Sequence, residues 1–292
     1  MKFIQYLFFR FLVFSFRFIP FGGLYLLSDF LAFFLRKVVK YRLTTVQKNL
    51  SMAFPDKDMK GNNILIKKIY KNLSDIMLES IKGFSLNESQ FKKRHKLIQF
   101  EPLKEAYELN KSIMLVIGHY GNWEWGAFSP NYFIDQTIIG FYKPLTNKYI
   151  NSFALRKRAS SGTVLADINK TSAYFEKYHD KNSLFLMAAD QSPTKPKYAI
   201  WTNFLGVKTP CIHGIEKYID RHDLAVLYCN VIRVKRGFYE LHVEWITSPL
   251  EEQKLYGETT KIFMQKLEKI IREKPENWLW THNRWKHKDF KV

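Results

Sequence analysis

A short apolar run that ends in a glycine and a histidine places the strongest constraint on the fold of this chain. The run covers residues 112–117 and is followed directly by Gly118 and His119. Its aliphatic and β-branched side chains predict a buried strand. Gly121 then allows a tight turn or a close approach of the backbone to a ligand. A strand that ends in this way delivers an imidazole to the edge of a sheet, where open α/β folds bind their substrates.

Glu124 follows this histidine closely and falls in the first turn of the helix that we expect to begin there. From that position the carboxylate can reach back and orient the imidazole of His119. A neutral histidine held by a carboxylate is a general base for a hydroxyl or amine nucleophile. Most pairs at this spacing are surface pairs or satisfied, partly buried histidines. The residues around the pair therefore decide whether a catalytic pair or a structural one is the better interpretation.

The segment 118–124 reads Gly-His-Tyr-Gly-Asn-Trp-Glu and resembles the H-x-x-x-x-E block of lysophospholipid acyltransferases. It is most similar to the lipid A biosynthesis (lauroyl and myristoyl) acyltransferases, in which this block usually reads H-x-G-N-W-E. The resemblance continues in order through residues 40–286, and together the blocks are specific although most are weak alone. They are Tyr41-Arg42 with Asn49-Leu50 and Ala53-Phe54-Pro55, then Tyr142-Lys143-Pro144-Leu145 with Asn147, Asp190-Gln191-Ser192-Pro193, Phe204-Leu205-Gly206-Val207 with Pro210, and Trp280-Thr281-His282-Asn283-Arg284-Trp285-Lys286.

The resemblance implies an α/β fold like that of the glycerol-phosphate acyltransferases, with a mixed, mainly parallel sheet covered by helices. It implies an enzyme that moves a fatty acyl group from acyl carrier protein, or from acyl-CoA, onto a hydroxyl of a lipid. A lipid A precursor is the leading acceptor, and an aminolipid or another glycolipid is the alternative. The location it implies is the bacterial inner membrane, with the catalytic domain on the cytoplasmic face. We expect no cofactor.

Acyl transfer from a thioester needs a base for the acceptor hydroxyl and stabilisation of the developing oxyanion. We expect His119 to be the base and Glu124 to fix its tautomer. Asp190 follows the strand predicted at 183–188, so it should reach the same sheet edge as His119; a helix N-cap is the competing account. No G-x-S-x-G elbow occurs in the sequence, which favours direct attack by the acceptor over an acyl-enzyme.

An arginine is a further candidate, either to bind a phosphate or to polarise the thioester carbonyl. The resemblance implies an essential arginine shortly after the Tyr142 block, where Arg156 is slightly preferred over Arg158. A solvated basic helix face explains either residue nearly as well. The residues expected to contact substrate are Asn122, Trp123, Lys143, Arg158, Gln191 and Arg284. Turn shape is the more economical account of the first two, and aromatic packing explains much of the segment around Arg284.

Charge and the N-terminal residues point to a membrane surface. Basic residues outnumber acidic ones 46 to 27, and a net charge of +19 attracts anionic lipid, nucleic acid or an acidic carrier protein. Residues 3–19 are dense in aromatic side chains, with Lys2, Arg10 and Arg17 on one stripe of a helix. We find no signal-peptide cleavage site, and no uncharged run reaches the ~18 residues of a clean membrane span.

We therefore divide the chain into membrane-anchoring helices at 1–42 and an acyltransferase catalytic domain at 43–292. The anchor is expected to be two short helices that lie in the bilayer surface. One tilted span and a buried helical hairpin are the alternatives. Residues 56–111 are predicted to form a helical connector. Beyond it we expect strands at 113–117, 136–142, 183–188, 225–233 and 239–245, with helices from Glu124 and at 148–158, 172–179, 212–221 and 257–273.

Three rival functions are weaker. A metal-dependent hydrolase would use His119, Glu124 and Asp190 as ligands, but the sequence has no H-E-x-x-H or H-x-H spacing, and Cys211 and Cys229 are isolated. A nucleic-acid-binding protein would explain the charge, but no recognition motif is present. A non-catalytic membrane scaffold would leave the His119 block unexplained. We expect neither a bound metal nor a nucleic acid partner.

Overall fold

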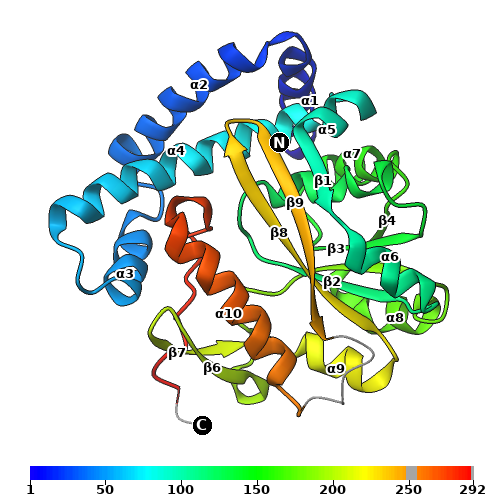
Figure 1. The fold of residues 1–292 in the computed structure, drawn as a ribbon. Helices are drawn as coiled ribbons and strands as arrows, with labels where there is room; N and C mark the ends of the chain where they lie inside the picture. Colours follow the sequence, from blue (N-terminus) through cyan, green and yellow to red (C-terminus); the bar gives the residue numbers. More distant parts are fainter. Residues whose placement is uncertain (248–254, 291–292) are drawn as a thin grey trace.

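A seven-stranded mixed sheet forms the centre of the molecule (Figure 1), and the computed structural model describes residues 1–247 and 255–290. The strand order is β1-β9-β8-β2-β5-β3-β4. The β8–β9 hairpin is antiparallel, while β1 runs parallel to β9 and the pairs from β8 to β4 are parallel. This confirms the mixed, mainly parallel α/β fold. The strands are β1 (His95–Gln99), β2 (Ile113–Ile117), β3 (Ile138–Tyr142), β4 (Val164–Asp167), β5 (Leu184–Ala188), β8 (Ala225–Lys235) and β9 (Phe238–Thr247).

Helices cover both faces of the sheet, so β2 is buried on each side. Met114 and Val116 belong to the core that packs against α8 (Thr171–Tyr178), α9 (Gly214–Arg221) and α10 (Glu258–Glu273). Ile113, Leu115 and Ile117 belong to the core on the other face, which includes α5 (Glu88–Arg94) and α6 (Glu101–Glu108). Burial on both faces is why this strand reads as an unbroken apolar run rather than an alternating one.

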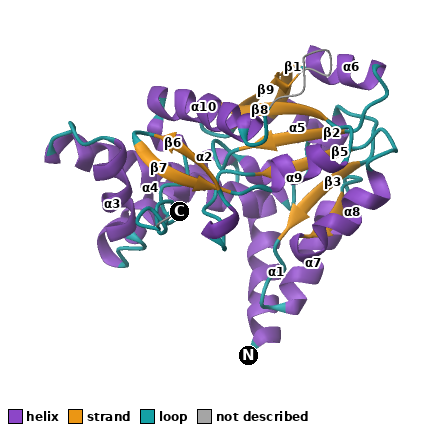
Figure 2. Ribbon diagram, turned by 90° about the horizontal axis from the view of Figure 1, so that it is seen from below, coloured by secondary structure: helices purple, strands orange, loops and turns teal. Residues whose placement is uncertain are grey.

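The N-terminal helices pack against the long helix α4 (Met59–Gly83). Helix α1 (Lys2–Phe18) and helix α2 (Phe21–Phe33) are separated at Pro20, and a π-helical turn (Phe34–Val38) and α3 (Leu43–Ala53) follow. Figure 1 shows α2 running alongside α4, and Figure 2 shows α1 projecting from the rest of the molecule. No helix in the described part of the chain is both long enough and apolar enough to cross a bilayer.

Lys82 joins the end of α1 to α4. Its ammonium group donates to the carbonyl oxygens of Phe16, Arg17 and Ile19, at 2.5, 3.1 and 2.9 Å. The last carbonyl groups of a helix have no partner within the helix, and a cation at that end also opposes the negative pole of the helix dipole. A buried lysine therefore caps α1 from the neighbouring helix.

Several elements differ from the sequence-based expectation. Residues 95–99 form the edge strand β1 inside the predicted helical connector, and β4 was not predicted. A second small sheet, β6 (Ile200–Phe204) with β7 (Val207–Cys211), was also not predicted. Leu205 and Gly206 have φ of 52° and 79°, which gives this hairpin a tight turn with both central residues left-handed. The helix expected from Glu124 is a short 3₁₀ turn (Trp123–Ala127), because Gly126 and Pro130 interrupt it.

Candidate active site

A histidine and an aspartate meet at the carboxyl ends of two neighbouring parallel strands. Ile117 of β2 pairs with Ala188 of β5, and the chain continues from these residues to His119 and Asp190. Nδ1 of His119 lies 2.6 Å from Oδ1 of Asp190, and the backbone N–H of His119 donates to Oδ2 at 3.0 Å. Asp190 is therefore at the sheet edge where the sequence analysis expects it.

Trp278 completes the surroundings of the aspartate, because its indole N–H donates to Oδ2 of Asp190 at 2.8 Å. The carboxylate is almost fully buried, with 2 % of the residue exposed. Burial alone would raise the pKa of Asp190, but the charge of His119 and the donated hydrogen bonds outweigh it and lower the pKa to about 2. Asp190 is thus a carboxylate at neutral pH.

The imidazole of His119 is held in one orientation, with its second nitrogen facing the side-chain amide of Gln191. Burial alone would lower the pKa of His119, but the charge and hydrogen bond of Asp190, together with the charge of Glu124, raise it above the ordinary value. Because Nδ1–H donates to Asp190, the lone pair of the neutral ring is on Nε2. The side-chain nitrogen of Gln191 lies 3.1 Å from Nε2. This geometry suits a general base whose partner carboxylate stabilises the imidazolium.

Glu124 does not orient the histidine through a hydrogen bond, so that expectation is wrong. Its Oε2 accepts from the guanidinium of Arg158 at 2.9 Å, and the position beside Nδ1 is taken by Asp190. The 3₁₀ turn explains the difference, because it does not continue as the helix that would direct Glu124 back toward the ring. Glu124 acts on His119 through its charge alone. The Trp123 ring contacts the imidazole instead, with ring centroids 5.3 Å apart in an edge-on arrangement.

Of the two candidate arginines, the structure brings Arg158 to the site and not Arg156. Both lie on α7 (Lys148–Ala159), but residues two positions apart face different sides of a helix. Arg156 is exposed and donates to Ser152 of the same helix. The slight preference for Arg156 is therefore not supported by its contacts. Lys143 is exposed just beyond β3, and it is not part of the cluster around His119.

Arg284 cannot contact substrate in this structure, because it is fully buried. It donates to the carbonyl oxygen of Pro210 at 2.7 Å and contacts the sulfur of Cys211 at 3.3 Å, so it fixes the C-terminal segment to β7. The expectation that it binds substrate is wrong. His282 is similarly engaged, since its Nε2 accepts from the backbone N–H of Ser192 at 3.0 Å. Burial lowers the pKa of His282 to about 4, which keeps the ring neutral.

The loop after His119 is held by contacts from outside itself. Gly121 has φ of +61°, and a Cβ there would lie 2.3 Å from the carbonyl oxygen of Val231, so only glycine fits. The backbone N–H of Gly121 donates to the carbonyl oxygen of Asn277, and the carbonyl oxygen of His119 accepts from the backbone N–H of Leu279, both at 3.1 Å. The C-terminal segment therefore runs beside the loop as a clamp.

Asn122 is fully buried and shapes the turn, in agreement with the more economical of the two accounts above. It accepts from the backbone N–H of Trp125 at 3.2 Å and donates to Oε2 of Glu79 at 2.7 Å. Sequence reasoning did not identify Glu79 or Trp278. The available signal for Glu79 is an acidic residue on the core-facing side of a helix, close to Ile76.

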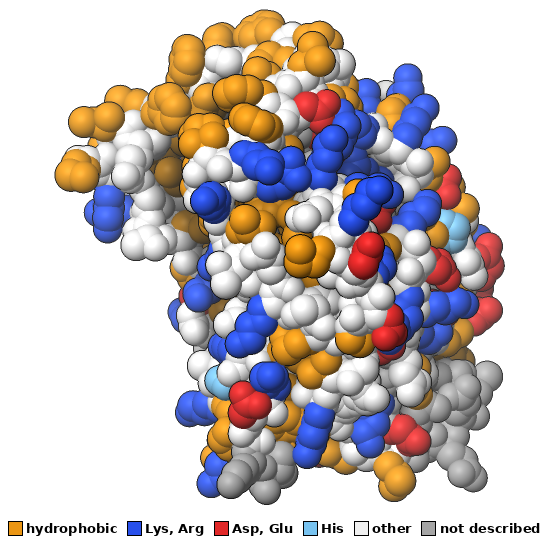
Figure 3. All heavy atoms as spheres, turned by 90° about the vertical axis from the view of Figure 1, so that its left-hand side faces the viewer, with side chains coloured by type: hydrophobic (Ala, Val, Ile, Leu, Met, Phe, Trp, Pro, Cys, Tyr) orange, Lys and Arg blue, Asp and Glu red, His pale blue; other side chains and the backbone are white. Residues whose placement is uncertain are grey.

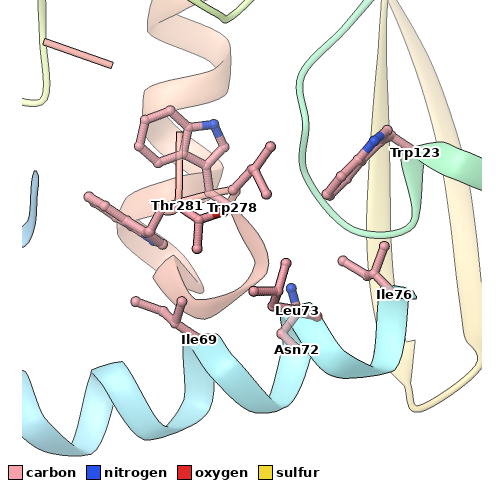
Figure 4. A pocket seen from close by; sticks show the side chains of 9 residues that line it. Ile69, Asn72, Leu73, Ile76, Trp123, Trp278 and Thr281 are labelled. Atoms are coloured by element: carbon pink, nitrogen blue, oxygen red, sulfur yellow. The ribbon is translucent and has the colours of Figure 1, made fainter. Parts of the chain in front are cut away.

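A small, mainly apolar cavity adjoins the site (Figure 4). Four residues of α4 form one wall, the 278–281 segment faces them, and Trp123, whose ring contacts His119, completes the lining. Most of the residues that line it come from α4 and from the C-terminal segment. The lining residues are Ile69, Asn72, Leu73, Ile76, Trp123, Trp278, Leu279, Trp280 and Thr281.

The contacts at the site argue against a metal centre formed by His119, Glu124 and Asp190. Nδ1 of His119 is engaged by Asp190, and Glu124 is engaged by Arg158. The donor atoms of the three residues therefore point to separate partners and do not converge on one position, as metal ligands must.

The chain is similar in sequence to known proteins over most of its length. Residues 2–287 match the family model described as bacterial lipid A biosynthesis acyltransferase. The lipid A biosynthesis palmitoleoyltransferase of Escherichia coli K12 is 22% identical over 269 residues, which cover 92% of this chain and 86% of that protein. The lipid A biosynthesis lauroyltransferase of the same organism is 22% identical over 272 residues, covering 92% and 87%. The chain, an O-acyltransferase, belongs to the bacterial lipid A biosynthesis acyltransferase family.

Proposed function

We propose that the protein transfers a fatty acyl group from the thioester of acyl carrier protein, or of coenzyme A, to a hydroxyl of a lipid A precursor. The observation that carries the mechanism is the buried His119–Asp190 pair at the end of β2 and β5. Nε2 of His119 takes the proton of the hydroxyl as its oxygen attacks the thioester carbonyl. The carbon–sulfur bond then breaks, the ester bond is complete, and the imidazolium returns the proton to the departing thiolate.

Asp190 and Gln191 prepare Nε2 for this step. Asp190 keeps the proton of the neutral ring on Nδ1 and stabilises the positive charge that develops on proton transfer. The Gln191 amide lies where the acceptor hydroxyl would approach Nε2, and we assign it to binding of that hydroxyl. Trp123 forms a wall beside the imidazole.

Arg158 is the residue we assign to negative charge in the substrate. Glu124 engages one nitrogen of its guanidinium, and a planar group with five N–H donors has others left for a phosphate or a thioester oxygen. Its side chain is 22% exposed, so it is held in place and still accessible. In this proposal Glu124 positions Arg158, in addition to its electrostatic effect on His119.

The net charge of +19 favours an acidic carrier protein as the acyl donor, with coenzyme A as the alternative. Competition between the two donors at equal concentration would distinguish them. A lower KM for the carrier thioester, with a steep loss of rate as salt is added, is the result expected for docking of an acidic protein.

We further propose that α1 and α2, within the 1–42 segment, lie on the cytoplasmic surface of the inner membrane, with residues 43–292 as the catalytic domain. Figure 3 shows hydrophobic side chains gathered at the top of the molecule, where Figure 1 places these helices, with lysine and arginine side chains beneath them. An apolar face bordered by basic residues matches a bilayer with anionic headgroups. The exposed apolar residues include Phe3, Ile4, Leu7, Phe8, Phe11, Phe14, Phe18, Leu26, Leu27, Phe30 and Phe33.

The test compares wild type with His119→Ala and with the matched control His242→Ala, a partly exposed histidine on β9. Each purified protein is incubated with labelled acyl carrier thioester and either a lipid A precursor or a total lipid extract, and the lipids are analysed by mass. We expect wild type and the control to acylate the precursor and His119→Ala to lose activity by about 10³-fold or more. Equal product from His119→Ala would overturn the role of the base. Acylation of an aminolipid instead would change the acceptor and leave the chemistry intact.

A further inference from the structure

A buried carboxylate on α4 connects the N-terminal helices to the loop that carries the catalytic histidine. Glu79 is fully buried, and its two oxygens accept hydrogen bonds from three elements. Tyr25 of α2 donates to Oε1 at 2.9 Å, while Tyr239 of β9 and Asn122 of the loop donate to Oε2, each at 2.7 Å. The backbone carbonyl of Glu79 also accepts from the indole of Trp125 at 3.0 Å.

We propose that Glu79 is a positioning residue for acyl transfer, which fixes the turn after His119 and thereby holds the imidazole against Asp190. This inference rests on the proposed function of the same site. Glu79 does not touch the reacting atoms. It acts through Asn122 and Trp125, which belong to the turn that begins immediately after His119 and Gly121.

The turn needs such an external hold. It is a short 3₁₀ segment (Trp123–Ala127), and hydrogen bonds of this type are weaker than those of an α-helix. Asn122 stabilises its start by accepting from the N–H of Trp125, and Glu79 in turn fixes Asn122. A displacement of about 1 Å in a catalytic group can lower the rate by about 10²-fold. The Glu79 carboxylate reduces that freedom at Asn122, where the turn begins, while the backbone carbonyl of Glu79 holds Trp125.

The chemistry of the position also favours this role over simple packing. Burial of a carboxylate is unfavourable unless it is paired and hydrogen-bonded, so an apolar residue would fill a core position of α4 at a lower free-energy cost. The three donors to the carboxylate come from α2, from β9 and from the loop after His119. Its arrangement therefore specifies where the loop lies, in addition to filling space.

Asp75 provides a matched control from the same helix. It lies one turn before Glu79, is equally buried, and also links α2 to the β8–β9 hairpin. Ser28 donates to Asp75 at 2.6 Å, and the guanidinium groups of Arg233 and Arg236 bind it from the hairpin. Its side-chain bonds do not reach the loop after His119, so a change at Asp75 disturbs the same layer without releasing the loop.

The first experiment exchanges the donor and the acceptor. Asn122→Asp keeps the oxygen that accepts from Trp125 but places a second carboxylate against Glu79, and we expect kcat to fall at least about tenfold. Glu79→Gln alone keeps an oxygen for Asn122, and the Tyr25 hydroxyl can turn to accept from the new amide, so kcat should stay within about threefold. In the double variant the glutamine amide donates to the new aspartate, and kcat should recover at least about tenfold over Asn122→Asp.

Asp75→Asn combined with Asn122→Asp is the control pair, and it should give no recovery of kcat. Failure of the Glu79 pair to recover, or equal recovery with the Asp75 pair, would overturn the proposal.

The second experiment removes the acceptor without adding a charge. Glu79→Leu should lower kcat at least about tenfold while KM changes less than about twofold, because the substrate-binding groups remain. Asp75→Asn should retain kcat within about threefold, even if it lowers the melting temperature as much as Glu79→Leu does. The positioning role would be contradicted if Glu79→Leu retained its kcat. It would also be contradicted if Asp75→Asn lost kcat in proportion to its loss of melting temperature.

A readout that does not need turnover separates this inference from the proposed function. Nitrogen-15 NMR of labelled histidine follows the titration and tautomer of His119 in wild type and in Glu79→Leu. If the loop is released, contact with Asp190 weakens and the pKa of His119 falls from its raised value. An unchanged titration in folded Glu79→Leu would refute the positioning role, whether or not the chosen acceptor is the right one.

Discussion

Oδ1 of Asp190 lies 2.6 Å from Nδ1 of His119, although 71 positions separate the two residues in the chain. The parallel pairing of β2 with β5 brings them together, because each follows its strand at the same distance from the paired residues Ile117 and Ala188. The sheet, and not the local sequence, therefore builds the pair. Its geometry has consequences for rate, pH dependence and stability.

Asp190→Asn is expected to shift the pH dependence of kcat/KM to lower pH while lowering its plateau. His119 must be neutral to act as a base, so the rate rises as pH increases through the pKa of His119. Asp190 raises that pKa, so its loss moves the acidic limb to lower pH. An asparagine also fails to fix the tautomer, and the plateau should fall by about 10³-fold. The same profile is measured for Asp223→Asn, a change at an exposed aspartate, and its acidic limb should stay at the pH of the wild-type limb.

The same pair should make stability depend on pH. The lowered pKa of Asp190 stabilises the fold above the unfolded value of 3.8, and this is lost as pH falls toward about 2. The raised pKa of His119 stabilises the fold below the unfolded value of 6.5, and this is lost as pH rises through the folded value. The difference in free energy of unfolding between wild type and Asp190→Asn should therefore be largest between about pH 4 and 6.5, on the order of 2 kcal/mol. Denaturant titration at a series of pH values measures it, and a difference independent of pH would contradict the coupling.

Arg158 and Arg156 should respond differently to substitution. Arg158→Ala removes a guanidinium beside Glu124 and should lower kcat/KM by about 10- to 100-fold. Arg156→Ala removes a cation bonded only within its own exposed helix turn and should change kcat/KM by less than about twofold. Steady-state kinetics of the two variants decide between them, and a larger loss for Arg156→Ala would restore the assignment preferred from sequence.

Arg284→Met should affect folding more than catalysis. The buried guanidinium holds β7 and makes no contact with the site, so its loss should cost about 1–3 kcal/mol of stability. KM should remain within about twofold of wild type, in contrast to the effect of losing a substrate-binding group. Thermal unfolding and kinetics on the same preparation test both parts. A raised KM with an unchanged melting temperature would indicate contact with substrate.

The apolar surface of α1 and α2 should control membrane binding. Phe11 and Leu26 are exposed on these two helices, and changing both to glutamate places charges in the apolar layer. Cosedimentation with anionic phospholipid vesicles should weaken by at least about tenfold. Changing Ile98 of β1 and Leu109 at the end of α6 to glutamate, both exposed apolar residues, adds the same charge and should leave vesicle binding intact. If both variants lost vesicle binding equally, the change in net charge, and not the apolar surface of the two helices, would explain the loss.

The strongly apolar and turn-forming parts of the fold could be predicted from the sequence. Strand β2 was predicted over residues 113–117 because burial on both faces leaves a continuous apolar run. The hairpin between β8 and β9 could be read from Gly237, which has φ of +70°. Strand β1 could not, because an edge strand carries charged, exposed residues such as Lys96 that resemble a solvated helix.

The site was predictable in its histidine and in the position of Asp190, but its contacts were not. The spacing of Glu124 from His119 suggested a direct bond, yet the interruption of the expected helix by Gly126 turns this carboxylate toward α7. Trp278 and Glu79 reach the site through tertiary packing, from segments that carry no local motif for it. Sequence spacing reports neighbours within one element, whereas these partners depend on how elements pack.

The ammonium group of Lys82 binds three carbonyl oxygens at the end of α1 and so attaches α1 to α4. Helix α4 in turn holds the loop of His119 through Glu79. The end of the first helix and the turn after His119 are thus both bonded to the same helix, α4. Under the proposal that α1 rests on a membrane surface, α4 would set the distance from that surface to the imidazole, and so the depth of the hydroxyl that it reaches.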